Sequence, residues 1–306
     1  MSTPAPRHFL DYVADEHIVI CSRMDMRTIL NLRTTSRRAM YAVAAMLRAN
    51  LERLCQLYVP RAPSFLIALD RLHAFVGGNV AAAFLTRQLP APSAPLEIFV
   101  SSEGWAALVD ELVQVQGAGM GHIAQAEDDY VENWLERHAI ESATPFWTLR
   151  GTPIILYESY TSDPLAPIAC RPSSVEIAYV NPIYFGTGYP SLTLERRGLV
   201  ADTRDSSEAA DVVEKWESWG IDVRFAAKEW RRYQRFKCAA TLGLCPFQLR
   251  SFGDDASMRC RMIPTAATPL KTTVQWRLAA RRCGVECGGL DGQGSVARNI
   301  ERFLDA

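Results

Sequence analysis

Apolar residues recur at helical spacing through the first sixty residues of the chain. Three short helices are predicted between residues 9 and 59, with Asp25 and Ser36 in capping positions before the second and third. Prolines at positions 60 and 63 end this block, so we predict a helical module over residues 1–60. Three helices of this length bury little apolar surface alone. We therefore expect the module to dock on the rest of the chain, on a partner, or on both.

After residue 63 the pattern changes to short apolar runs that alternate with amphipathic segments. Strands are predicted at Ala74–Val76 and Leu96–Val100, with a helix opened by Gly77-Gly78 between them. Gly151 splits "FWTLRGTPIILYES" into a hairpin, and "SVEIAYVNPIYF" supplies further strands. Later segments predict helices at Ala209–Trp219, Phe225–Leu242 and Val296–Leu304. The fold class is therefore α+β, with a mixed sheet and a helical C-terminal part over residues 61–306.

Composition narrows the class of protein. The chain has 306 residues and a formal net charge of -1, which argues against DNA or another polyelectrolyte as a dominant partner. The longest apolar run is too short to span a bilayer, and we expect neither a membrane partner nor a secretory signal. The eight cysteines are dispersed and no glycosylation sequon is present. Reduced thiols in a cytoplasmic or nuclear protein are therefore expected.

The segment "DEHIVICSRMDMRTILNLRTTSRRAMYAV" resembles an F-box, although Val13-Ala14 stands where that family usually has Leu-Pro. The resemblance is clearest in the Leu32-Arg33…Ser36-Arg37 pattern. It implies a helical hook that inserts into a groove of a Skp-type adaptor of a cullin ubiquitin ligase. The positions carried over as partner contacts are Ile18, Ile20, Cys21, Met24, Ile29 and Leu32. The alternative is a three-helix cap that packs only on its own domain.

The rest of the chain resembles a nucleotidyltransferase fold found beside F-boxes in uncharacterised fungal proteins. The resemblance rests on Gly77-Gly78 with the following helix, on "PLEIFV", on "YPSLTLERRG" and on "CAATLGLCPFQLRSFGDD". Paired glycines at a helix start let a phosphate approach backbone amides, and Asn79 can add a side-chain donor. Gly77, Gly78 and Asn79 are thus the candidate nucleotide-binding residues. Equally, the glycines can serve only tight packing of strand and helix.

Nucleotidyl transfer requires carboxylates that hold two divalent metal ions against the phosphates. Active members carry two aspartates on one face of a strand and a third carboxylate on a neighbouring strand. Here Pro95 occupies the first position, Glu97 the second, and Glu158 lies at the displaced end of the third strand. Glu97 and Glu158 remain as catalytic candidates, which is too little for two-metal catalysis. Mg²⁺ is expected as a cofactor only if the chain is an enzyme.

Two other sets of residues are candidates for binding a ligand. Cys283 and Cys287, with Cys238, Cys245 and Cys260, have separations that match no zinc ribbon or finger, so no metal site is expected. The segment "AAKEWRRYQRFK" interleaves basic and aromatic residues, as single-stranded nucleic-acid sites do. In segments of this kind the aromatic residues more often face a core while the arginines are solvated, so nucleic-acid binding is not expected.

These observations favour a non-catalytic interaction protein. The F-box-like hook would bind a ligase adaptor, and the nucleotidyltransferase-like domain would recruit a substrate protein whose identity the sequence does not give. The alternative is a divergent metal-dependent nucleotidyltransferase, or a sensor that binds a nucleotide without turnover.

Overall fold

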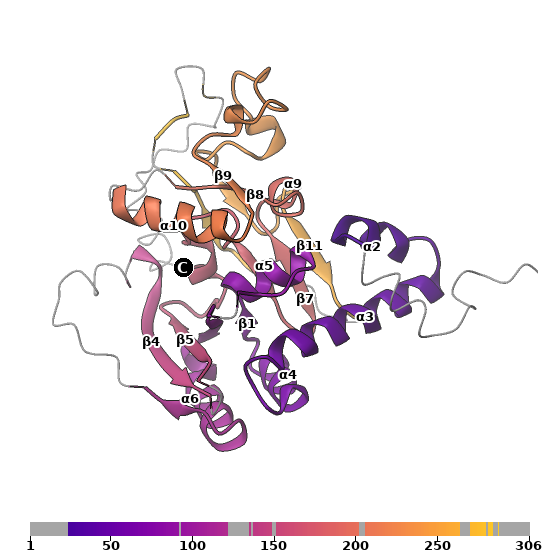
Figure 1. The fold of residues 1–306 in the computed structure, drawn as a ribbon, viewed down its shortest axis with the longest axis vertical. Helices are drawn as coiled ribbons and strands as arrows, with labels where there is room; N and C mark the ends of the chain where they lie inside the picture. The colour runs from indigo at the N-terminus through magenta and orange to yellow at the C-terminus, as the bar shows by residue number, and fades with distance from the viewer. Residues whose placement is uncertain are drawn as a thin grey trace, which may run out of the picture.

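A mixed β-sheet flanked by helices forms the centre of the molecule (Figure 1). The computed structural model describes residues 24–91, 93–121, 135, 137–148, 151–201, 206–263, 270–279, 281–283 and 287. Within these residues the main sheet has eight strands in the order β11-β7-β6-β1-β2-β5-β4-β3. Only β2 and β5 pair in parallel in this sheet as described, and the other neighbours are antiparallel. The α+β class predicted from the sequence is confirmed.

The N-terminal helices are α2 (Met26–Arg33), α3 (Arg37–Cys55) and α4 (Ala62–Arg71). The Asp25 side chain accepts from the Thr28 N–H at 2.7 Å, and Ser36 Oγ accepts from the Ala39 N–H at 3.1 Å, so both predicted caps are confirmed. These helices share one hydrophobic core with the sheet. The core includes Leu47, Leu51, Leu54, Val76, Ile98 and Ile154. Residues 24–60 thus dock on the rest of the chain.

The segment around the two glycines forms β1 (Phe75–Val76), α5 (Gly78–Thr86) and β2 (Leu96–Ser101). β1 lies antiparallel to β2, and β2 lies parallel to β5 (Pro153–Ser159). β5 continues the predicted hairpin with β4 (Ile140–Trp147), whose turn contains Gly151 at a φ of 73°. After β2 the chain enters α6 (Ser102–Asp110), a five-residue π-helical turn (Glu111–Val115) and β3 (Gly119–Met120).

Alternation along β2 and β5 divides the core between the two faces of the sheet. Leu96, Ile98 and Val100 belong to the cluster that includes residues of α2–α6, whereas Phe99 and Tyr157 belong to the cluster on the opposite face. The second cluster also receives residues of α8 (Ala166–Ala169) and aromatic side chains from residues 189–276. Both faces are covered, which explains the near-continuous apolar sequence of β2.

The second half of the chain extends the sheet and adds two small ribbons. β6 (Ala178–Val180), β7 (Tyr184–Thr187) and β11 (Met258–Arg261) complete the main sheet, and α9 (Pro190–Thr193) follows β7. β8 (Arg197–Leu199) and β9 (Asp222–Arg224) pair in parallel around α10 (Ser206–Ser218), while β10 (Arg250–Ser251) pairs with β12 (Gln275–Trp276).

The helix predicted at Phe225–Leu242 is wrong. Residues 225–242 contain two 3₁₀ turns, Ala227–Glu229 and Ala240–Leu242, joined by non-helical backbone. Trp230 and Tyr233 N–H groups each donate to the carbonyl three residues earlier, so the chain turns repeatedly without continuing a helix. The Trp230 indole also donates to Asp222 at 2.7 Å, which fixes it on β9. Tertiary anchoring of the aromatics overrides the helical pattern.

No helix among the described residues is both long enough and apolar enough to cross a membrane. The helix predicted at Val296–Leu304 lies outside the described residues.

Candidate functional site

The turn at Gly77-Gly78 packs directly against Glu97. Gly77 caps α5, and its N–H donates to the Glu97 carbonyl at 3.0 Å. Gly78 has a φ of 54°, and a Cβ added there would lie 1.5 Å from Glu97 Oε2. Glycine is therefore required both for the backbone conformation and for the approach of the carboxylate. The side chain of Glu97 occupies the space over the turn, and Asn79, the next residue of α5, is buried.

Glu97 forms a buried ion pair with Arg171, which follows α8. The Arg171 Nη2 and Glu97 Oε1 atoms are 3.4 Å apart, and the two side chains are 6% and 8% exposed. The guanidinium also lies over the rings of Phe99 and Tyr157, 5.2 Å and 4.8 Å from their centroids. Stacking and the opposite charge together fix the position of the arginine.

A second ion pair adjoins the first and completes a balanced charge cluster. The Lys215 Nζ atom on α10 lies 2.6 Å from Glu176 Oε1. Burial favours the neutral forms of Arg171, Glu176 and Lys215, but the neighbouring opposite charges prevail. Lys215 and Arg171 thus lower the pKa of Glu176, Glu176 raises that of Lys215, and Glu97 raises that of Arg171. We call Glu97, Arg171, Glu176 and Lys215 the charge cluster.

The positive charges of the cluster oppose the binding of a metal ion, although two carboxylate oxygens are left without a partner in the described part of the chain. Glu97 Oε2 and Glu176 Oε2 have no hydrogen-bond partner among the described residues, so one oxygen of each carboxylate is unsatisfied. Arg171 already supplies a positive charge beside Glu97. A divalent cation at Glu97 would therefore be placed next to a guanidinium, which disfavours its binding.

Glu158, the other carboxylate candidate, does not lie near Glu97. In the β2–β5 pairing Glu97 is opposite Ile155 and Glu158 is opposite Val100. Glu158 is thus three positions beyond the partner of Glu97, and its side chain leaves the opposite face of the sheet. There it accepts a hydrogen bond from Ser142 Oγ at 2.8 Å. The two catalytic candidates do not form one site.

The F-box-like positions differ in their exposure. Ile29 is fully buried in the core shared with the sheet, and Met24 and Leu32 are half-buried against it. The Arg33 guanidinium also donates to the Arg261 carbonyl on β11. Ile18, Ile20 and Cys21 lie outside the described residues. Of the three described positions, only Met24 and Leu32 are partly exposed to solvent.

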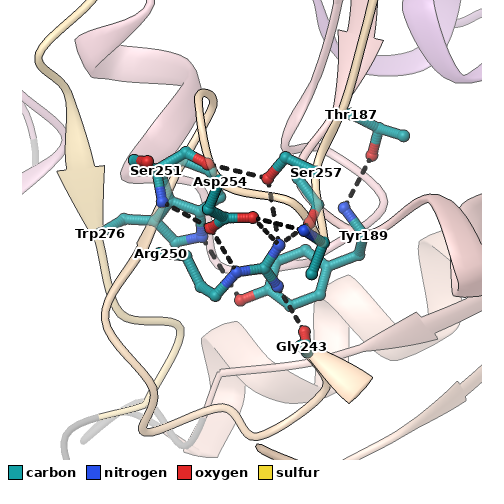
Figure 2. Close-up of polar contacts among 10 residues, drawn as sticks. Thr187, Tyr189, Gly243, Arg250, Ser251, Asp254, Ser257 and Trp276 are labelled. Atoms are coloured by element: carbon teal, nitrogen blue, oxygen red, sulfur yellow. Dashed lines mark hydrogen bonds and ion pairs between the residues drawn. The ribbon is translucent and has the colours of Figure 1, made fainter. Parts of the chain in front are cut away.

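The "LRSFGDD" element forms an ordered polar cluster around Arg250 (Figure 2). Arg250 is 2% exposed and pairs with Asp254, its Nε and Nη2 atoms lying 2.8 Å and 3.0 Å from the two carboxylate oxygens. Its other donors reach the Gly243 carbonyl, the Gly188 carbonyl and Ser257 Oγ. With these partners, the arginine joins the loop after β10 to the end of β7. This arrangement stabilises the fold and presents no open ligand position.

The basic and aromatic segment at 228–236 divides as the packing alternative predicted. Trp230 and Tyr233 are buried, whereas Lys228, Arg231, Arg232 and Arg235 are exposed. Arg232 lies 2.7 Å from Glu195 Oε1. The two buried aromatic faces are therefore unavailable for stacking on bases.

Four cysteines far apart in the sequence meet at one place. The sulfur atoms of Cys238, Cys245, Cys283 and Cys287 all lie within 4.8 Å of one another. Burial raises the pKa of the Cys245 thiol, and a backbone hydrogen bond from Phe247 opposes that rise. Cys260, the fifth cysteine considered from the sequence, lies instead on β11. Cys238 and Cys245 lie far along the chain from Cys283 and Cys287, so no short sequence motif could have predicted this group.

A scan against protein-family models found no match, and neither the curated proteins nor the solved structures gave a significant match to this chain.

Proposed function

We propose that this protein is a non-catalytic interaction protein built on a nucleotidyltransferase-like core. The observation that carries the proposal is the buried pair of Glu97 and Arg171. An active site of this class would need the Glu97 carboxylate for a metal ion. Arg171 neutralises that carboxylate, and the carboxylate itself covers the turn where a phosphate would approach.

The order of elements around Glu97 supports the nucleotidyltransferase-like core of this proposal. A glycine turn connects β1 to α5, β2 follows with Glu97 near its start, and β5 lies parallel beside β2. The resemblance implies this arrangement for the two strands that carry the metal ligands. Positions 95 and 154–156, however, hold proline and aliphatic residues where ligands would be required.

Titration calorimetry with ATP and GTP in the presence of Mg²⁺ or Mn²⁺ tests the proposal. We expect no saturable heat with the wild-type chain. The matched variants are Glu97→Gln and Glu158→Gln, which remove each candidate carboxylate from its own face of the sheet. Saturable binding that Glu97→Gln abolishes would instead establish the divergent nucleotidyltransferase, and binding that survives this change would favour a nucleotide sensor.

We propose further that the N-terminal helices bind a Skp-type adaptor and that the larger domain recruits a substrate protein. The F-box-like sequence carries this part of the proposal, and the half-exposed Met24 and Leu32 are the described residues available for contact. An adaptor of this class works in the cytoplasm or nucleus. The dispersed cysteines of the sequence favour such a reducing compartment.

Co-purification of the chain with a Skp-type adaptor tests this part. We expect a complex that the double variant Met24→Glu/Leu32→Glu weakens at least tenfold. Ile29→Glu is unsuitable because a charge at this buried position would unfold the helices. Ile67→Glu is the matched control, since Ile67 is 63% exposed on α4, outside the F-box-like segment. No complex with the wild-type chain would refute the adaptor proposal.

A further inference from the structure

The cysteine group is built from two segments that the chain brings together from a distance. Cys238 and Cys245 flank the 3₁₀ turn Ala240–Leu242, and Cys283 and Cys287 follow β12. Gly243 ends the turn with a φ of 68°, which reverses the chain so that Cys245 returns toward Cys238. The Leu244 N–H donates to the Ala239 carbonyl at 3.0 Å and closes this turn.

Contacts outside the cysteines fix the second segment against the first. The Ala279 N–H donates to the Pro246 carbonyl at 2.9 Å. The guanidinium groups of Arg277 and Arg282 lie over the Phe247 ring, 4.8 Å and 6.0 Å from its centroid. These contacts hold the residues next to Cys283 beside the residues next to Cys245. The approach of the four sulfur atoms therefore follows from ordered packing of both segments.

The sulfur separations match those of a tetrahedral thiolate site. Cys245 Sγ lies 3.7 Å from Cys283 Sγ and 3.5 Å from Cys287 Sγ, and Cys283 Sγ lies 3.7 Å from Cys238 Sγ. A metal ion bound at about 2.3 Å from each of four sulfurs separates neighbouring sulfurs by about 3.8 Å. A metal ion at the centre requires only small movements of the side chains.

The chemistry of the ligands selects the metal. Four soft thiolates favour Zn²⁺ over Mg²⁺ or Ca²⁺, which prefer oxygen. Binding of Zn²⁺ to four thiols releases four protons and leaves a site with a net charge of about -2. Lys228 and Lys237 line the pocket beside Cys238 and Cys245 and can balance this charge. The Phe247 N–H donates to the Cys245 sulfur, a contact that also orients a thiolate ligand.

We propose that Cys238, Cys245, Cys283 and Cys287 bind one Zn²⁺ ion in a structural site. All four tetrahedral positions are filled by protein, so no position is open for a substrate or water. The ion joins the loop after the 3₁₀ turn to the segment after β12. Because β12 pairs with β10, where Arg250 begins its polar cluster, the site secures that whole region.

Metal analysis of the full chain, purified under reducing conditions without chelator, tests this proposal. We expect one equivalent of zinc per chain by plasma mass spectrometry and its loss in Cys245→Ser and Cys283→Ser. Cys170→Ser and Cys260→Ser are matched controls that should retain the metal, because both thiols lie outside the group. Replacement by Co²⁺ should give the visible absorption of a tetrahedral tetrathiolate site.

Titration of the wild-type chain with a mercurial reagent gives a second measurement that does not depend on folding of the variants. Zinc release should be complete only after the thiols of this group have reacted, so its end point lies between about four and eight of the eight thiols of the chain. Background metal content with four freely reactive thiols would overturn the proposal. So would iron alone in place of zinc, or disulfides among these cysteines in peptide mapping.

Discussion

Arg171 shows how a single side chain decides the chemistry around Glu97. Its guanidinium contacts the carboxylate and two aromatic rings, while Lys215 faces Glu176 nearby. Two buried acids and two bases then balance without a metal ion. A complete cluster of this kind contributes little net stability, because desolvation offsets the attraction. Removal of one member leaves an uncompensated buried charge and is destabilising.

Removal of Arg171 alone should therefore lower the free energy of unfolding more than removal of both Arg171 and Glu97. We expect Arg171→Leu to lower the free energy of unfolding by about 3–5 kcal/mol, because Glu97 is left buried without its partner. The double variant Arg171→Leu/Glu97→Leu should recover much of that loss. Urea unfolding of the wild type, both single variants and the double variant measures the coupling. Equal losses in Arg171→Leu and in the double variant would contradict it.

Asp254 should make the stability depend on pH. Partial burial acts to raise its pKa, but hydrogen bonds from Arg250 and Ser251 prevail and lower it. The folded-state pKa is thus below the unfolded value of about 3.9. The pair stabilises the fold fully above that value, and this contribution is lost as the pH falls from there through the folded-state pKa.

Asp254→Asn should accordingly reduce stability at neutral pH by about 1–3 kcal/mol and flatten the acid part of the profile. Urea unfolding at about pH 7 and about pH 3 measures both effects. Asp255→Asn is the matched control, because Asp255 is the exposed neighbour in the same loop. An equal effect of both variants would show that the Arg250 contact is not responsible.

At the scale of elements, the sequence predicted correctly those features in which a residue shapes the nearby backbone, such as helix caps and glycine turns. Asp25 and Ser36 were predicted as caps and are caps, and the glycine turns before α5 and β5 are present. The pattern failed at Phe225–Leu242, because Trp230 is fixed by Asp222 on another strand. The approach of four distant cysteines was not predicted for the same reason, because no local sequence rule encodes a contact between remote segments.

Removal of the proposed zinc ion should loosen particular elements. We expect chelation to increase amide exchange in β12 and in the turn before Cys245, because the ion joins these segments. β2 and β5 lie in the main sheet and should keep their protection. Hydrogen exchange with mass spectrometry of the loaded and chelated chain makes the comparison. Unchanged exchange in β12 would mean that the ion does not secure this region.

The whole molecule depends on a core that crosses the boundary predicted at residue 60. Local periodicity predicted the N-terminal helices, several strands and the α+β class. It left open where the apolar side of α3 docks. Leu47, Leu51 and Leu54 pack in one cluster with Val76 and Ile98 of the sheet, so helices and sheet have no separate cores here.

This shared core predicts a single cooperative unfolding transition. All seven tryptophans follow residue 60, so their fluorescence reports mainly on the larger domain, whereas circular dichroism also detects α2 and α3. Leu51→Ala removes a fully buried side chain of α3 and should cost about 2–5 kcal/mol. If the core is common, both signals should shift together to lower temperature. A shift in circular dichroism alone, with the fluorescence midpoint unchanged, would instead establish an independent helical module.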